Sequence, residues 1–330
     1  MKKRILAASS LFLSTFGFSY AAKGPATTDP TVASKDPDFA IQGEYAARAE
    51  IATKGKQGQY GLQVVALGDG KFQGALYKGG LPGSGAKGNE FVFLKGETKD
   101  GKTGLKAASG ENVVISGDTA TGSKGDKKLF VYDRVERKSP TLGKKPPKGA
   151  KLLFGGKKAD RFSSGKKLDG DLLKEGVVSM DSFGDFTLHL EFRTPYKPKT
   201  KPGSQDRGNS GVYIFNNYET QILDSFGIKG EFNFCGALYR KKPPAVNMCL
   251  PPLSWQTYDI EFTAPRFKDG KKVKNARITT RHNGVLIHDD FELDKGTGAG
   301  GGRPEKVKGQ IHLQGHGNPV RFRNIWLVEK

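Results

Sequence analysis

The chain has 330 residues, of which 54 are Lys or Arg and 34 are Asp or Glu, so its formal charge is +20. The hydrophobic fraction of 35% includes 21 Phe, which is enough to build cores and excludes a chain that is disordered throughout. The 45 Gly, the 17 Pro and the lack of a long apolar period of 3.6 residues exclude a helical bundle, and two Cys exclude a disulfide scaffold or a multi-cysteine zinc module.

Residues 1–21 have the order of a secretory signal peptide. A basic start is followed by an apolar run over 5–18 and then by small residues up to Ala21. The run is shorter than the roughly 20 residues that a membrane-spanning helix needs. We therefore expect cleavage near Ala21, a periplasmic or secreted protein, and no transmembrane segment. Residues 22–40, rich in Pro, Thr, Asp and Ala, predict an exposed linker.

The next part of the chain, 41–137, consists of short β-type runs separated by glycines. The runs 61–67 and 71–77, joined through a Gly-Asp-Gly turn, predict a β-hairpin. The region contains no His and few clustered acids, so we expect a small all-β accessory module without a catalytic set. The Pro- and Lys-rich segment 138–150 is predicted to be an extended linker between this module and the rest of the chain.

The positive charge is spread over both halves of the chain, and no nucleic-acid-binding motif is present. A protein that binds nucleic acid would concentrate its basic residues on one surface. We therefore interpret the charge as a solvated surface and expect no nucleic-acid partner.

The region 151–330 contains alternating strands whose polar faces carry reactive side chains. Three of these strands are predicted at 186–193, 218–223 and 310–316, and Asn283–Gly284 forms the turn of a further hairpin. The polar faces carry His189, Glu191 and Arg193 on the first strand, Glu219 and Gln221 on the second, and Gln310, His312, Gln314 and, where the strand extends so far, His316 on the third. Many alternating strands without helices predict a two-sheet β-sandwich of the jelly-roll type, in which polar rows line one concave face. Trp255 could offer a flat surface to a sugar ring there, or could belong to the core.

Blocks of this region resemble the 3-keto-disaccharide hydrolase family, long catalogued as a domain of unknown function. They occur in family order: LLFGG at 152–156, GDFTLHLEFR at 184–193, GNSGVY at 208–213, YETQILD at 218–224, WQTYDI at 255–260, HNG at 282–284 and QGHGNPVRFRNIW at 314–326. Gly155–Gly156 departs from the Asp-Gly that is usual in the family. The module before the domain is similar to accessory segments of planctomycete-like exported proteins.

The resemblance implies a concanavalin-like sandwich that acts as a 3-keto-glucoside 1,2-lyase and a 3-keto-2-hydroxy-glucal hydratase. Its substrates would be 3-keto-glucosides or related oxidised disaccharides. A ketone at C3 acidifies the proton at C2, so a base can remove it, the group at C1 then leaves with help from an acid, and water adds to the double bond. Such a site needs a base, an acid and a cationic or hydrogen-bonding group near O3.

On these grounds we expect Glu219 and His316 to act as acid and base, with Glu191 as a third catalytic candidate. Arg207 or Arg193 could stabilise the enolate. The residues expected to contact substrate are His189, Arg193, Arg207, Asn209, Gln221, Asp224, Trp255, Gln314 and Asn318. A divalent metal held by His and Glu could serve as Lewis acid instead, although no ligand spacing is diagnostic.

Two alternatives to enzymatic function remain open. The first is a non-catalytic carbohydrate-binding or adhesion protein that uses the same concave face, and the second is a binder of anionic polymers. Cys235 and Cys249 predict a disulfide in an exported domain, with two buried free thiols as the alternative.

Overall fold

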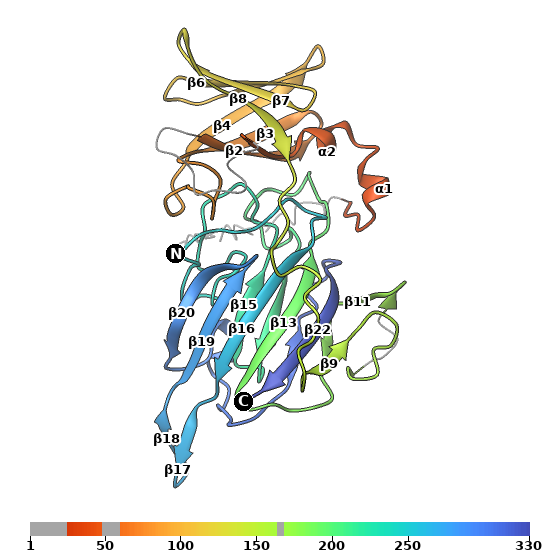
Figure 1. Ribbon diagram of the computed structural model, residues 1–330, viewed down its shortest axis with the longest axis vertical. Coiled ribbons are helices and arrows are strands. Elements are labelled where there is room, and N and C mark those ends of the chain that lie inside the picture. Colours follow the sequence, from red (N-terminus) through yellow and green to blue (C-terminus); the bar gives the residue numbers. More distant parts are fainter. Residues whose placement is uncertain (1–24, 48–59, 164–167) are drawn as a thin grey trace, which may run out of the picture.

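The computed structural model describes residues 25–47, 60–163 and 168–330, so the signal peptide predicted over 1–21 lies outside the described residues. A β-barrel stands at one end of the molecule and a β-sandwich at the other (Figure 1). No helix in the described ranges is long and apolar enough to cross a membrane.

The N-terminal module is a closed antiparallel barrel. Its strands are β1 (Gly43–Ala46), β2 (Tyr60–Gly68), β3 (Lys71–Lys78), β4 (Val92–Lys99), β5 (Lys102–Lys106), β6 (Glu111–Ser116), β7 (Thr119–Lys124) and β8 (Lys127–Val135). The predicted hairpin is confirmed as β2–β3, and both turn residues, Asp69 and Gly70, have positive φ. Each strand pairs with two neighbours, which closes the barrel, and inward side chains such as Leu62, Phe72 and Leu105 fill it.

The segment ahead of the barrel is folded, so the exposed linker expected over 22–40 is wrong for this part. It forms the short helices α1 (Pro30–Ala33) and α2 (Pro37–Ile41), each begun by an Asp N-cap followed by Pro. The cap of α2, Asp36, also accepts a hydrogen bond from the Tyr196 hydroxyl at 2.9 Å, and Phe39 packs edge-on against the Tyr196 ring at 5.0 Å. These contacts fasten the segment to the sandwich.

The sandwich consists of a large and a small sheet. In spatial order the large sheet contains β10 (Leu168–Asp169), β11 (Leu172–Lys174), β22 (Arg321–Glu329), β13 (Phe186–Arg193), β16 (Gln256–Thr263), β19 (Ala276–His282) and β20 (Val285–Leu293), with β9 (Lys151–Phe154) beside β22. The small sheet contains β12 (Val177–Val178), β21 (Ile311–Leu313), β14 (Ser210–Ile214) and β15 (Tyr218–Ile222). A ribbon of β17 (Arg266–Lys268) and β18 (Lys271–Lys274) and the 3-10 helix η2 (Gly298–Gly300) complete it.

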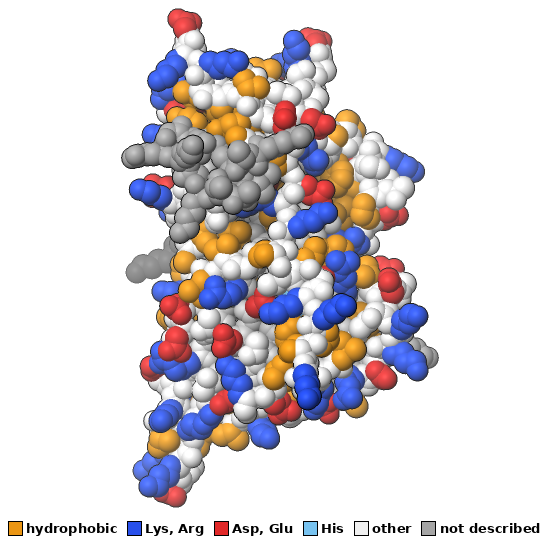
Figure 2. All heavy atoms as spheres, in the orientation of Figure 1, with side chains coloured by type: hydrophobic (Ala, Val, Ile, Leu, Met, Phe, Trp, Pro, Cys, Tyr) orange, Lys and Arg blue, Asp and Glu red, His pale blue; other side chains and the backbone are white. Residues whose placement is uncertain are grey.

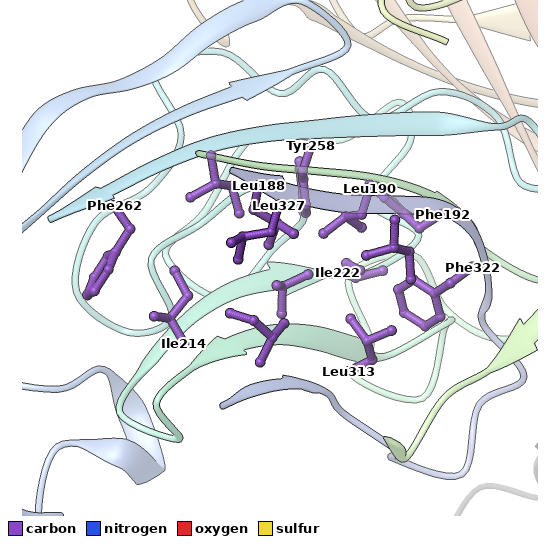
Figure 3. Close-up of a cluster of buried hydrophobic side chains, with 14 of the residues drawn as sticks. Leu188, Leu190, Phe192, Ile214, Ile222, Tyr258, Phe262, Leu313, Phe322 and Leu327 are labelled. Carbon is purple, nitrogen blue, oxygen red and sulfur yellow. The ribbon is translucent and has the colours of Figure 1, made fainter. Parts of the chain in front are cut away.

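The core lies between the two sheets. The apolar face of β13, with Leu188, Leu190 and Phe192, packs toward Ile222 and Leu313 of the small sheet (Figure 3). The predicted all-β, jelly-roll class is thereby confirmed. Because side chains alternate along a strand, the polar rows of both sheets must point outward, in opposite directions.

The segment 138–150 lies along the outer face of the large sheet instead of spanning free space between the modules (Figure 1). Ser139 hydrogen-bonds to Thr257 at 2.6 Å, and Thr141 donates to Asp259 at 2.8 Å. The Lys144 carbonyl accepts from the Trp326 indole at 3.1 Å. We call 138–150 the strap. It differs from the expected free linker because polar groups of the sheet satisfy its own polar groups.

Candidate active site

Glu219, Tyr213 and His312 form one row across the outer face of the small sheet. The strand register places Tyr213 of β14 directly opposite both Glu219 of β15 and His312 of β21. Neighbouring residues on each strand, such as Ile214 and Ile311, point into the core, which fixes the row on the outer side. The Tyr213 and His312 rings are stacked with their centroids 5.8 Å apart.

Glu219 is the carboxylic acid of this row, and its pKa is raised well above the ordinary value. Its side chain is 2% exposed, and burial raises the pKa of its carboxyl to about 7, although the hydrogen bond from Tyr213 acts in the opposite direction. Its backbone N–H donates to the Thr297 hydroxyl at 2.7 Å, which holds β15 against the segment before η2. A carboxyl group that titrates near neutral pH is suited to take and return a proton.

Amide side chains extend the face beside Glu219. The Gln221 amide donates to Gln205 at 3.0 Å and to Asn209 at 3.4 Å, which brings Gln221 and Asn209, both predicted to contact substrate, side by side. The Gln221 and Gln314 side-chain oxygens are buried and accept no hydrogen bond from the described residues. These oxygens keep the capacity to accept from hydroxyl groups.

A cation stands at the other side of the row. Arg303 donates to the Asn216 carbonyl at 2.9 Å, and its charge lowers the pKa of Tyr213, although burial raises that pKa more strongly. The His312 ring lies 3.2 Å from the Asn216 side chain. A base, a phenol, an imidazole and a guanidinium therefore surround one stretch of the sheet.

Tyr213, His312 and Arg303 were missed as site residues by sequence reasoning. Tyr213 occurs within a family block, and its position two residues after Gly211 places it on the polar face of its strand. His312 lies on the predicted polar face of 310–316. The register between the strands, which the pattern of a single strand does not contain, would have identified both.

His316 and Asn318 lie on the loop that follows β21. The His316 ring is exposed and makes no hydrogen bond within the part of the chain that the structure describes, and no recorded contact joins it to Glu219. Asn318 accepts from the Gly208 backbone at 3.1 Å and donates to the His316 carbonyl at 3.3 Å, so it shapes this loop.

His189 and Glu191 lie on the outer face of the large sheet, on the other side of the core from Glu219. His189 pairs with Asp259 at 2.8 Å. Glu191 accepts from the Arg323 guanidinium and from the Gly143 backbone of the strap, each at 2.6 Å. The expected grouping of Glu191 and His189 with Glu219 is therefore wrong, because the two strands belong to different sheets.

The groups that surround Glu191 stabilise its ionised form. Burial opposes ionisation, but the hydrogen bonds from His189, Asn324, Gly143 and Arg323 outweigh it and lower the pKa of Glu191 to about 2. The strap covers the group, and Glu191 is 1% exposed. Glu191 is therefore ionised at neutral pH, and the hydrogen bond that it accepts from Gly143 ties the strap to the sheet.

Arg193 and Trp255 share that outer face and do not reach Glu219. The Arg193 and Arg323 guanidinium carbons lie 5.0 and 4.0 Å from the centroid of the Trp255 ring. Two guanidinium groups thus contact the Trp255 ring, which was expected to stack against a sugar or to join the core.

Arg207 and Asp224 form a buried ion pair at 2.7 Å, with both side chains 1% exposed. Arg207 also donates to the Thr200 carbonyl at 2.6 Å and approaches the Ala66 carbonyl of the barrel at 3.5 Å. The expected role of this pair in contacting substrate is not met, because its hydrogen-bonding capacity is used inside the protein.

Cys235 and Cys249 are free buried thiols in the structure, which contradicts the expected disulfide and matches the alternative reading. Cys235 lies 3.3 Å from the Tyr258 hydroxyl, and burial raises the pKa of Cys249.

Within the described ranges, no three His, Cys, Asp or Glu side chains gather in an arrangement that could hold a metal ion. The possible divalent metal thus has no ligand set in these residues.

Comparisons with known proteins identify a family and similar solved structures. Residues 149–328 match the model of a family described as the 3-keto-alpha-glucoside-1,2-lyase-like domain. The crystal structure of a candidate glycosyl hydrolase from Parabacteroides distasonis is 29% identical, with a TM-score of 0.50, over 56% of this chain and 85% of that one. A second candidate glycosyl hydrolase from that organism is 18% identical, with a TM-score of 0.40, over 55% of this chain and 94% of that one. No curated protein matches the chain.

Proposed function

The chain belongs to the 3-keto-alpha-glucoside-1,2-lyase-like domain family, and from this premise we propose that it cleaves 3-keto-glycosides on the outer face of the small sheet. The observation that carries the proposal is Glu219, a carboxyl group with a pKa of about 7 among hydroxyl, amide and cationic groups. Unlike an ordinary glycosidase, this chemistry does not need a pair of carboxylates at a fixed separation.

In the proposed first step, ionised Glu219 removes the C2 proton of the sugar, and the electron pair moves into the C3 carbonyl to give an enolate. The Tyr213 hydroxyl, which hydrogen-bonds to Glu219, and the Arg303 guanidinium, whose charge acts on Tyr213, would stabilise the charge on O3. The enolate then restores the C3 carbonyl, forms a C1–C2 double bond and expels the substituent at C1. His316, on the neighbouring loop, is the proposed acid that protonates this leaving group.

In the second step, water adds its hydroxyl group to C1, its remaining proton passes to the deprotonated His316, and protonated Glu219 gives a proton to C2. The sum is hydrolysis of the glycosidic bond without an oxocarbenium ion. The amide oxygens of Gln221 and Gln314 are proposed to accept hydrogen bonds from the hydroxyl groups of the sugar. Export to the periplasm or the medium, where such sugars would be met, remains part of this proposal.

The test is to offer 3-keto-trehalose or an aryl 3-keto-glucoside beside the same sugar without the ketone. Release of the aglycone from the 3-keto compound alone supports the proposal. Binding of both sugars without any release would favour a carbohydrate-binding protein and would contradict the lyase.

A further inference from the structure

A second polar groove lies on the opposite side of the sandwich from Glu219, where the barrel, the strap and the large sheet meet. It consists of two adjoining hollows of about 460 and 400 Å³, which share Trp255 and Arg323 in their walls. Barrel residues 134–137 line one hollow, and Gly155–Gly156 and Arg193 line the other. Each hollow is large enough to enclose part of a sugar ring or its substituent.

The basic side chains that line the groove outnumber the acidic ones. Five basic side chains line the two hollows against three carboxylates, namely Arg134, Arg137, Lys138, Arg193 and Arg323 against Glu44, Glu136 and Asp171. The Arg137–Glu44 and Arg323–Glu191 ion pairs, each at 2.6 Å, balance two of the five cations, which leaves Arg134, Lys138 and Arg193 against Glu136 and Asp171. Lys138, on the strap, has no ion-pair partner in the described residues. Lys and Arg side chains also gather over this part of the face in Figure 2.

Arg193 is the centre of the unbalanced charge. It donates to the Thr28 carbonyl at 2.8 Å, but its Nε is buried without any hydrogen-bond partner in the described part of the chain. Burial, and the nearby charges of Arg323 and Arg321, lower the pKa of Arg193. Glu191 balances the charge of Arg323 through its Nε, but both guanidinium groups contact one indole ring and the charge of Arg323 still acts on Arg193, so an oxyanion bound to both groups would be stabilised.

From this geometry we propose that the groove binds a saccharide through a carboxylate or sulfate group, which the Arg193 and Arg323 guanidinium groups receive over Trp255. Guanidinium groups bind such oxyanions with paired, charge-assisted hydrogen bonds. The choice of a saccharide as the carrier rests on the carbohydrate-active family, while the site itself does not depend on Glu219. In this proposal the barrel and strap build a site that the sandwich alone would lack.

Calorimetric titration of the full chain tests the proposal with three hexasaccharides: an oligogalacturonate, a chondroitin sulfate and neutral maltohexaose. All are titrated into the Glu219→Gln variant, so that catalysis plays no part. We expect one or both anionic chains to bind at least about tenfold more tightly than the neutral chain. A preference for galacturonate identifies a carboxylate, and a preference for chondroitin sulfate identifies a sulfate.

Two variants locate the site. Arg193→Gln and Lys138→Gln should each weaken binding of the preferred chain, the first by about tenfold, whereas Lys271→Gln on the distant β17–β18 ribbon should not. Lys138 is exposed, so its variant keeps the test valid even if Arg193→Gln folds poorly. Equal binding of charged and neutral chains, or equal weakening by Lys271→Gln, would overturn the proposal. Because binding is measured in Glu219→Gln, a failure of the catalytic proposal does not affect this result.

Discussion

The Glu219 carboxyl lies over Gly211, in the space that a side chain at position 211 would occupy. A Cβ built on Gly211 would overlap Oε1 of Glu219 and stand 3.1 Å from its Cδ. The glycine therefore lets the carboxyl lie flat against β14, within the row formed with Tyr213.

This relationship predicts the effect of Gly211→Ala. Because the obstructing atoms are the far end of a flexible side chain, the protein should fold while Glu219 is displaced, and a small displacement of a catalytic group can cost about a hundredfold in rate. Measured kcat on a 3-keto-glucoside should fall with little change in Tm. The matched control is Gly104→Ala on β5, where a Cβ meets nothing within 4 Å. Equal activities of the two variants would contradict the placement of the site.

Glu219→Gln should stabilise the fold at alkaline pH. The pKa of Glu219 is raised from 4.5 to about 7 in the fold, so its contribution to stability is complete below about pH 4.5 and is lost as the pH rises through 7. The amide avoids this loss. We expect the variant to exceed the parent by up to about 3 kcal/mol at pH 8 and to gain much less at pH 4. Denaturant titrations at both pH values measure this, and a difference that is independent of pH would disprove the raised pKa.

The same residue predicts the pH profile of the parent enzyme. As a base, Glu219 must be ionised, so kcat/KM should rise with pH through an apparent pKa near 7. A profile that is flat between pH 5 and 8 would exclude Glu219 as the base.

Glu191→Gln should have the opposite pattern, a loss of stability without a loss of activity. The lowered pKa of Glu191, about 2, means that its contribution is present above about pH 4.5 and is lost as the pH falls through 2. Removing the charge should cost about 3 kcal/mol at pH 7, and the cost should shrink toward pH 3. Unfolding curves check this, and kcat/KM should stay within about twofold of the parent because Glu191 and Glu219 lie on different sheets. A loss of kcat comparable to that of Glu219→Gln would restore Glu191 to the catalytic set.

Arg207→Met should destabilise the protein by about 3–5 kcal/mol, because it leaves the buried Asp224 carboxylate without its partner. Adding Asp224→Leu should recover much of this loss, since an apolar pair replaces the ion pair. Guanidinium denaturation of the single and double variants measures both effects. A raised KM with unchanged stability would instead assign Arg207 to substrate.

Local patterns predicted the fold class and the face of each strand, because alternation is a property of a single strand. They could not assign strands to sheets, which depends on pairing between distant segments. Phe186–Arg193 pairs with β16 and β22, whereas Tyr218–Ile222 pairs with β14. Glu191 and Glu219 therefore look equivalent in sequence and lie on opposite sides of the molecule.

The sequence also did not show which charged side chains are buried in the fold. Arg207 becomes internal because Asp224 and several backbone carbonyls converge on it. The strap covers Glu191 although Pro and Lys in 138–150 are typical of an exposed linker. Glu219 and Gln221 were placed correctly on one polar face, since both their strand and the family block pointed to them.

The most direct test of the central claim is exchange at C2 in heavy water. The parent protein and Glu219→Gln are each incubated with a 3-keto-glucoside in D2O, and the recovered sugar and product are examined by NMR. The account predicts deuterium at C2 together with aglycone release in the parent, and neither in Glu219→Gln. Aglycone release without deuterium at C2, or undiminished release by Glu219→Gln, would contradict it.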